Sequence, residues 1–200
     1  MNSALRTLAG IVALAVLLMG CGSSPRNNHY VLTGDAGKIP TGNTPSLGVG
    51  PIKVPEYLNR TGMVFSRDGN QLQVSSTERW AEPLEAGVMR VVAINLAASL
   101  NTQDIRSFPW DPKRAPDYGV SITLLALDAN DDEATLVAEW RVFLPASLES
   151  VTRRVSRFKL PLPAGEISAG QIAPAYSQLL SQLSTQISQS IKKHLASASS

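Results

Sequence analysis

Three runs that alternate apolar with polar or small residues follow one another in the second half of the chain, at residues 118–128, 134–144 and 150–160. Successive side chains of a β-strand point to opposite faces, so alternation is typical of strands with one buried face. A polar segment, Asn130-Asp131-Asp132, supplies the turn between the first two runs. The spacing therefore predicts an antiparallel meander, whose apolar face has to be covered by other elements.

Two segments with helical spacing can supply that cover. Apolar side chains recur every three or four positions in residues 83–100, and Glu82 and Pro83 suit a helix entrance, where negative charge and a missing N–H are tolerated. Residues 169–195 predict a longer second helix, with one apolar stripe and a surface that is otherwise mostly serine and glutamine. Residues 197–200 are expected to fray.

The first half of the chain adds short strand signals. Residues 47–54 alternate apolar with small or polar side chains, and residues 63–66 and 71–74 flank Asp68-Gly69, a strong hairpin signal. Residues 29–32 are a candidate for a further short strand. The expected fold is a single α+β domain, mainly antiparallel sheet packed by two main helices, in the order β-β-β-α-β-β-β-α with a long C-terminal helix.

The N-terminus has the pattern of a secretion signal. Arg6 is followed by an apolar run at residues 8–19, and Cys21 is the only cysteine of the chain. A positive segment, roughly 7–15 apolar residues and a small residue at the cleavage site are typical of secretory signals, and spanning a bilayer takes ~20 apolar residues. The predicted organisation is a signal peptide at residues 1–20, a lipidated flexible tether at 21–29, the domain at 30–196 and the frayed tail at 197–200.

Cys21 is the predicted lipidation site. Leu18 and Gly20 before it resemble the lipobox of bacterial lipoproteins. That resemblance implies a diacylglycerol on the Cys21 sulfur and an N-acyl group, and two or more chains anchor a protein stably at ~0.8 kcal/mol per buried methylene. Gly22, where an aspartate would imply the inner membrane, implies the periplasmic face of the outer membrane. An ordinary secreted protein with a free thiol and an N-terminal membrane anchor are the alternatives.

The charge of the chain gives no electrostatic basis for binding nucleic acid. The formal net charge is +2 at pH 7, and removal of the signal peptide with Arg6 leaves +1. Arg153, Arg154, Arg157 and Lys159 predict a strand with a solvated, charged face.

The sequence contains no recognisable catalytic or metal-binding pattern. His29 lies at the tether and His194 in the last turn of the second predicted helix, and there is no zinc-type Cys/His cluster, P-loop or Gly-x-Ser-x-Gly elbow. The acidic residues 131–133 indicate an exposed turn rather than a metal loop. We expect no catalytic residue, no metal and no cofactor beyond the lipid on Cys21. A periplasmic hydrolase with an unrecognised site is the enzymatic alternative.

Two segments carry a family resemblance. Residues 47–60 read LGVGPIKVPEYLNR, residues 79–85 read RWAEPLE, and Tyr30-Val31-Leu32 opens the predicted domain. Together they are similar to the PqiC family, the auxiliary lipoproteins of ABC-type and MCE-type transport systems. The resemblance implies an α/β domain of antiparallel strands packed by helices, and a non-enzymatic lipoprotein that docks on an MCE-domain tunnel protein carrying lipids between the membranes. A carrier that itself binds lipid is the alternative, and it needs an apolar cavity of a few hundred Å³.

Two surface questions stay open in the sequence. Trp80 is either a core anchor where a strand turns into a helix or, with Tyr57, Leu58, Arg60 and Arg79, part of a partner-binding surface, because Trp, Tyr and Arg are the usual hot-spot residues. The apolar stripe of the C-terminal helix covers the sheet. Its polar face is either solvated or supports self-association into a homo-oligomeric ring around the end of a tunnel.

Overall fold

The computed structural model describes residues 26–35, 37, 39–66, 70–163 and 167–198. The predicted signal peptide, the lipidated Cys21 and residues 22–25 of the tether lie outside the described residues, as do the turn at Asp68-Gly69 and residues 199–200 of the tail.

The described residues form eight strands, two long helices and two 3-10 helices. In chain order they are β1 (Asn28–Tyr30), β2 (Leu47–Lys53), η1 (Glu56–Leu58), β3 (Gly62–Ser66), β4 (Leu72–Trp80), α2 (Leu84–Leu100), β5 (Ile105–Ser107), η2 (Pro112–Arg114), β6 (Tyr118–Ala129), β7 (Glu133–Leu144), β8 (Glu149–Pro161) and α3 (Ala169–Ala198). The predicted α+β class, the single domain and the long C-terminal helix are confirmed.

The strands form two sheets, and both are mixed rather than purely antiparallel. The larger sheet has the order β5-β2-β6-β7-β8 and the smaller one β1-β4-β3. The meander β6-β7-β8 is antiparallel as predicted, but β2 runs parallel to β5 and β6, and β1 runs parallel to β4. The parallel pairs join strands far apart in the chain, because a long crossover is needed to bring two strands into the same direction. The chain passes through β3, β4 and α2 between β2 and its partners, and through β2 and β3 between β1 and β4.

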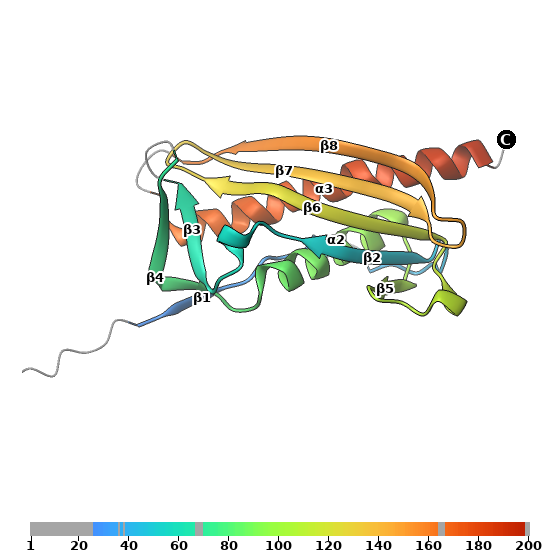
Figure 1. Cartoon of the computed structure of the whole chain (residues 1–200), viewed down its shortest axis with the longest axis horizontal. Coiled ribbons are helices and arrows are strands. Elements are labelled where there is room, and N and C mark those ends of the chain that lie inside the picture. Colours follow the sequence, from blue (N-terminus) through green and yellow to red (C-terminus); the bar gives the residue numbers. More distant parts are fainter. Residues whose placement is uncertain (1–25, 36, 38, 67–69, 164–166, 199–200) are drawn as a thin grey trace, which may run out of the picture.

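Both long helices pack on one face of the larger sheet, and among the described residues neither α2 nor α3 covers the opposite face (Figure 1). This packing explains the alternation in β7, where every second side chain is at most 1% exposed: Ala134, Leu136, Ala138, Trp140 and Val142. The apolar stripe of α3 meets the same layer through Ile172, Tyr176, Leu179, Leu180, Leu183, Ile187 and Ile191, all buried. One contiguous core therefore lies between the sheet and the helices.

The boundaries of the elements follow local chemistry. Helix α2 begins directly after Pro83 and ends at Leu100, and the next residue, Asn101, adopts the left-handed conformation with φ 52°. The turn between β6 and β7 is built as predicted: Oδ1 of Asn130 accepts hydrogen bonds from the backbone N–H of Asp132 and Glu133 at 3.0 and 2.8 Å.

The order of elements departs from the prediction in two places. The candidate strand near His29 is present as β1, so four strands precede α2, and a further strand, β5, precedes the meander. Both are three residues long and leave no readable alternation. Helix α3 also continues to Ala198, where the Ser197 hydroxyl donates to the carbonyl of His194 at 2.9 Å, so two residues of the predicted frayed tail are helical.

Candidate functional site

The structure brings the two segments of the predicted partner-binding surface together. Tyr57 and Leu58 lie in η1, and Arg60 lies between η1 and β3. Strand β3 pairs with β4 so that Gly62 is opposite Arg79, and the backbone N–H of Trp80 donates to the carbonyl of Thr61 at 2.7 Å. Residues distant in the sequence therefore lie side by side beside the smaller sheet.

Trp80 and Leu58 belong to the core. Trp80 is 7% exposed and Leu58 3%. The Trp80 ring stacks on Tyr176 of α3, with ring centroids 6.2 Å apart and an interplanar angle of 25°. This packing matches the interpretation of Trp80 as an anchor at the junction of β4 and α2.

Tyr57 and Arg79 are half-buried, and Arg60 is exposed. The Tyr57 hydroxyl donates to Oδ1 of Asp128 at 2.8 Å, which ties η1 to the end of β6. Burial, followed by the Asp128 carboxylate, raises the pKa of Tyr57 far above its ordinary value, so the phenol stays a neutral donor and is unsuited to act as a base. Of the predicted surface, Arg60, Arg79 and part of Tyr57 remain accessible, and their contact with a partner stays a prediction.

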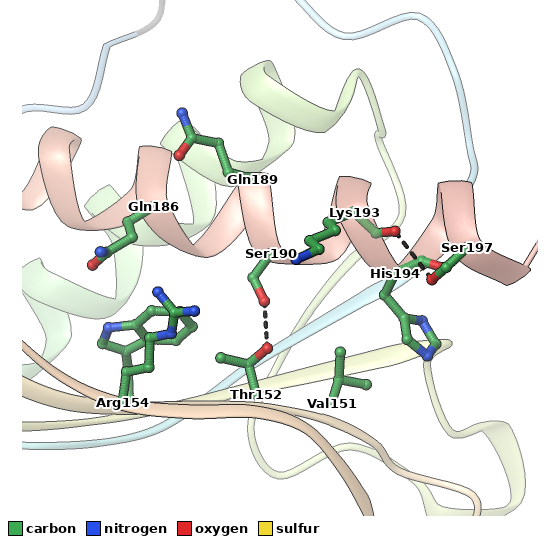
Figure 2. A pocket seen from close by; sticks show the side chains of 10 residues that line it. Val151, Thr152, Arg154, Gln186, Gln189, Ser190, Lys193, His194 and Ser197 are labelled. Carbon is green, nitrogen blue, oxygen red and sulfur yellow. Dashed lines mark hydrogen bonds between the residues drawn. The ribbon is translucent and has the colours of Figure 1, made fainter.

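A polar groove lies between β8 and the C-terminal half of α3 (Figure 2). Its volume is about 380 Å³. A hydrogen bond of 2.6 Å between the Thr152 and Ser190 hydroxyls links the strand wall to the helix wall. The lining side chains are Trp140, Val151, Thr152, Arg154, Gln186, Gln189, Ser190, Lys193, His194 and Ser197.

Positive charge dominates this groove. Arg154 rises from β8 and Lys193 comes from α3, on either side of the Thr152–Ser190 hydrogen bond in Figure 2. No acidic side chain lines the groove, and within the described part of the chain neither cation forms an ion pair. The groove is therefore suited to a ligand that carries negative charge.

His194 has a partner that the sequence did not reveal. Its Nδ1 lies 2.9 Å from the Tyr118 hydroxyl, and the two rings meet edge to face. Burial, followed by the nearby Asp117 carboxylate, raises the pKa of Tyr118, so the phenol remains protonated. The pair lies at the end of the groove near the C-terminus of α3. In the sequence, the only signal for this contact is the alternation that places Tyr118 on the helix-facing side of β6.

A second cavity lies beyond this pair, with a volume of about 640 Å³. Its lining is mostly apolar: Thr44, Pro45, Ala115, Pro116, Asp117, Tyr118, Leu144, Ala146, Ser147 and Leu195. The Asp117 carboxylate accepts hydrogen bonds from the Ser46 backbone N–H and hydroxyl at 2.8 and 2.9 Å, so the one acidic group of this wall is satisfied within the protein.

Both cavities are lined by residues of the C-terminal half of α3, and this half of the helix lies away from β1 (Figure 1). The segment after β1 meets the first turns of α3, where the backbone N–H of Thr33 donates to the Ser177 hydroxyl at 3.0 Å. Leu195 in the wall of the second cavity lies about 27 Å further along the same helix, at ~1.5 Å per residue. The first described residues and the second cavity are thus separated by more than half of the length of α3, and the polar groove lies between them.

No candidate metal site or membrane span is found in the part of the chain that the structure describes. No three His, Cys, Asp or Glu side chains of the described residues come together as metal ligands. None of the helices there combines the length and the apolar character needed to cross a bilayer.

Comparison with known proteins gives a family and a fold. A family model described as "ABC-type transport auxiliary lipoprotein component" matches residues 30–188. The intermembrane transport lipoprotein PqiC of Escherichia coli K12 is 26% identical over 137 residues, which cover 65% of this chain and 71% of that protein. A crystal structure of a protein from Xanthomonas campestris has a TM-score of 0.65 at 15% identity, covering 86% of this chain and 99% of that one. A crystal structure of an uncharacterized protein has a TM-score of 0.64 at 19% sequence identity, covering 84% of this chain and 99% of that one.

Proposed function

The chain belongs to the family of ABC-type transport auxiliary lipoprotein components, and from this premise we propose that it is a non-enzymatic docking component of an MCE-type intermembrane lipid transport system. Its lipidated Cys21 holds it on the periplasmic face of the outer membrane, and its domain engages the MCE-domain tunnel protein. The similarity to the E. coli intermembrane transport lipoprotein supports the assignment to this kind of system.

One structural observation supports a bridging role most directly. The described chain begins at one end of the domain, beside β4 and the first turns of α3, whereas the polar groove and the cavity of about 640 Å³ are lined by the C-terminal half of α3. A helix of 30 residues is ~45 Å long. An anchor attached just before β1 therefore leaves the cavity-bearing end free to reach a partner away from the membrane.

A photo-crosslinking experiment tests the bridging role. A photoreactive residue replaces Ser147, which is exposed at the far end, or Gln71, which is exposed at the smaller sheet, in the lipidated protein in its own membranes. We expect a covalent adduct with the MCE-domain protein from position 147 and none from position 71. An adduct from 71 alone would reverse the orientation, and no adduct from either position would contradict docking.

The lipid-carrier alternative has one observation in its favour. The cavity of about 640 Å³ at the far end lies within the usual range of ligand sites, ~300–1,000 Å³, and most of its lining is apolar. Solvent extraction of the mature chain carrying Cys21→Ser, purified without detergent, followed by mass spectrometry, tests this alternative. A stoichiometric lipid supports a carrier, and its absence argues for docking alone.

Self-association into a ring is a further part of the proposal. The polar face of α3 carries serine and glutamine side chains such as Ser181 and Gln189, which add no like-charge repulsion between copies. Sedimentation velocity of the mature chain carrying Cys21→Ser measures the oligomeric state. A monomer at high concentration would contradict the ring.

A further inference from the structure

Strand β8 is a long, open edge of the larger sheet. It is the last strand in the order β5-β2-β6-β7-β8 and it spans 13 residues. Figure 1 shows β8 as the outermost strand, with no described element beyond it. An edge strand directs about every second backbone N–H and C=O away from its sheet, where an extended chain can pair with them.

The polar groove runs along the helix-facing side of this edge. Thr152 and Arg154 of β8 line it from the strand side, and Gln189 and Lys193 of α3 line it from the helix side. Side chains of a strand added to β8 would alternate between two directions. One set would enter the groove, and the other would lie over the open face of the sheet.

The groove and the open face differ in how their positive charge is partnered. Arg154 and Lys193 lie in the groove. Arg157 is exposed on the open face, where its charge helps to lower the pKa of Glu133 of β7. Arg153 and Lys159, also on the open face, are already paired with acidic side chains of β7. The cations that form no ion pair with a described residue and that an added strand would meet are therefore Arg154 and Lys193, both in the groove.

The positive charge of β8 and the groove also favours one kind of binding partner for this edge over others. A second copy pairing through its own β8 would bring two sets of these cations together, which is unfavourable. A phosphate group alone would neutralise Arg154 and Lys193 but would leave the backbone edge unused. We propose that β8 and the groove bind an extended, acidic segment of another protein, which pairs with β8 as an added strand and places carboxylates against Arg154 and Lys193.

This proposal does not depend on the proposed transport role. Backbone pairing supplies affinity with little sequence preference, and alternate side-chain contacts supply selectivity. The competing explanation is that the cations only protect an edge from aggregation, because charged side chains on edge strands are a common defence. The two explanations differ in whether an acidic strand binds.

A titration followed by NMR separates them. The protein is the isotope-labelled mature chain, residues 21–200, carrying Cys21→Ser. The probe is a capped peptide of four Thr-Glu repeats, and the comparison peptide has four Thr-Gln repeats. We expect shifts of the β8 backbone amides and of α3 amides from Gln186 to Ser197, with affinity at least tenfold weaker for the Thr-Gln peptide.

Matched variants test the residues. Arg154→Gln with Lys193→Gln removes two charges from the groove, and we expect it to weaken binding of the Thr-Glu peptide at least tenfold. Arg157→Gln with Lys192→Gln removes the same charge from the same strand and helix, outside the groove. We expect at most a small loss for this control pair.

Three outcomes would overturn the proposal. The first is that millimolar Thr-Glu peptide shifts no β8 amide. The second is that both variant pairs lose affinity equally, which would indicate non-specific attraction. The third is that inorganic phosphate or dihexanoyl phosphatidic acid shifts the groove residues while the peptide does not, which would assign the groove to a small anion or a lipid headgroup. None of these results bears on crosslinking at position 147, so the two proposals fail separately.

Discussion

Replacing Trp80 with alanine removes the indole that packs at the junction of β4 and α2. The side chain is 7% exposed and stacks on Tyr176, which is itself 1% exposed. Truncating a buried tryptophan to alanine costs roughly 3–5 kcal/mol, because the lost transfer free energy and the cavity left behind add up. The total free energy of unfolding of a domain is about 5–15 kcal/mol, so this loss is a large share of the stability.

Equilibrium unfolding in urea measures the change. The protein is the mature chain carrying Cys21→Ser, and far-UV circular dichroism is the signal, because the chain has three tryptophans and fluorescence would mix their contributions. At roughly 2–4 °C per kcal/mol for a chain of this length, the melting temperature should also fall by about 6–20 °C. Arg60→Ala is the matched control from the same surface, and an exposed side chain should change stability by no more than about 0.5 kcal/mol.

The result that would refute the reasoning is specific. If Trp80→Ala lowers the free energy of unfolding by less than about 1 kcal/mol, well below the cost of truncating a core tryptophan, and capture of a partner is lost, then Trp80 acts at a surface. If Trp80→Ala is strongly destabilising and Arg60→Ala alone loses the partner, the partner docks beside the smaller sheet, with Trp80 supporting that surface from the core, and docking at the far end of α3 is contradicted.

Three further predictions follow from other contacts. Cys21→Ser should leave the circular dichroism spectrum unchanged and release the protein from the outer membrane; persistence in that fraction after a high-salt wash would contradict lipid anchoring. Ser156→Ala should cost about 1–3 kcal/mol in urea unfolding, because it leaves the buried Trp140 Nε1–H, now 2.9 Å from the serine hydroxyl, without an acceptor; an unchanged midpoint would show that another acceptor replaces it. The hydrogen bond from Arg106 lowers the pKa of Asp104, so its contribution to stability is present above the unfolded-state pKa and is lost as pH falls through the folded-state pKa. Arg106→Gln should therefore reduce stability more at pH 7 than at pH 3, and an equal loss at both would contradict the linkage.

Local sequence patterns predicted much of the fold. The alternation in β6 and β7 and the turn at Asn130 predicted the meander, because one face of these strands is fully buried and the contrast between the faces is strong. The start of α2 was predicted from Pro83. The parallel pairing of β2 with β6 was not, because it joins segments that no local pattern connects.

The groove could not be predicted from the sequence, because β8 and α3 meet there through polar side chains on both elements. Arg154 belongs to the helix-facing side of β8 together with Thr152 and Ser156, whereas Val155, an apolar residue, faces outward and is 64% exposed. Hydrophobic alternation therefore gives the wrong faces for this strand. The prediction of a solvated, charged face correctly described Arg153, Arg157 and Lys159, and missed that Arg154 points to the other side.

The polar contact between β8 and α3 also limits how the helix can sit on the sheet. Apolar contacts are tolerant of sliding, since Ile187 and Ile191 would stay buried after a small shift. The hydrogen bonds between the Thr152 and Ser190 hydroxyls and from the Ser156 hydroxyl to Gln186 Oε1, both 2.6 Å, do not tolerate such a shift. A slip of one residue moves the helix by ~1.5 Å and breaks both. These two hydrogen bonds therefore select one position of α3 along the sheet over positions shifted by a residue. As a result, the two walls of the groove keep a single alignment.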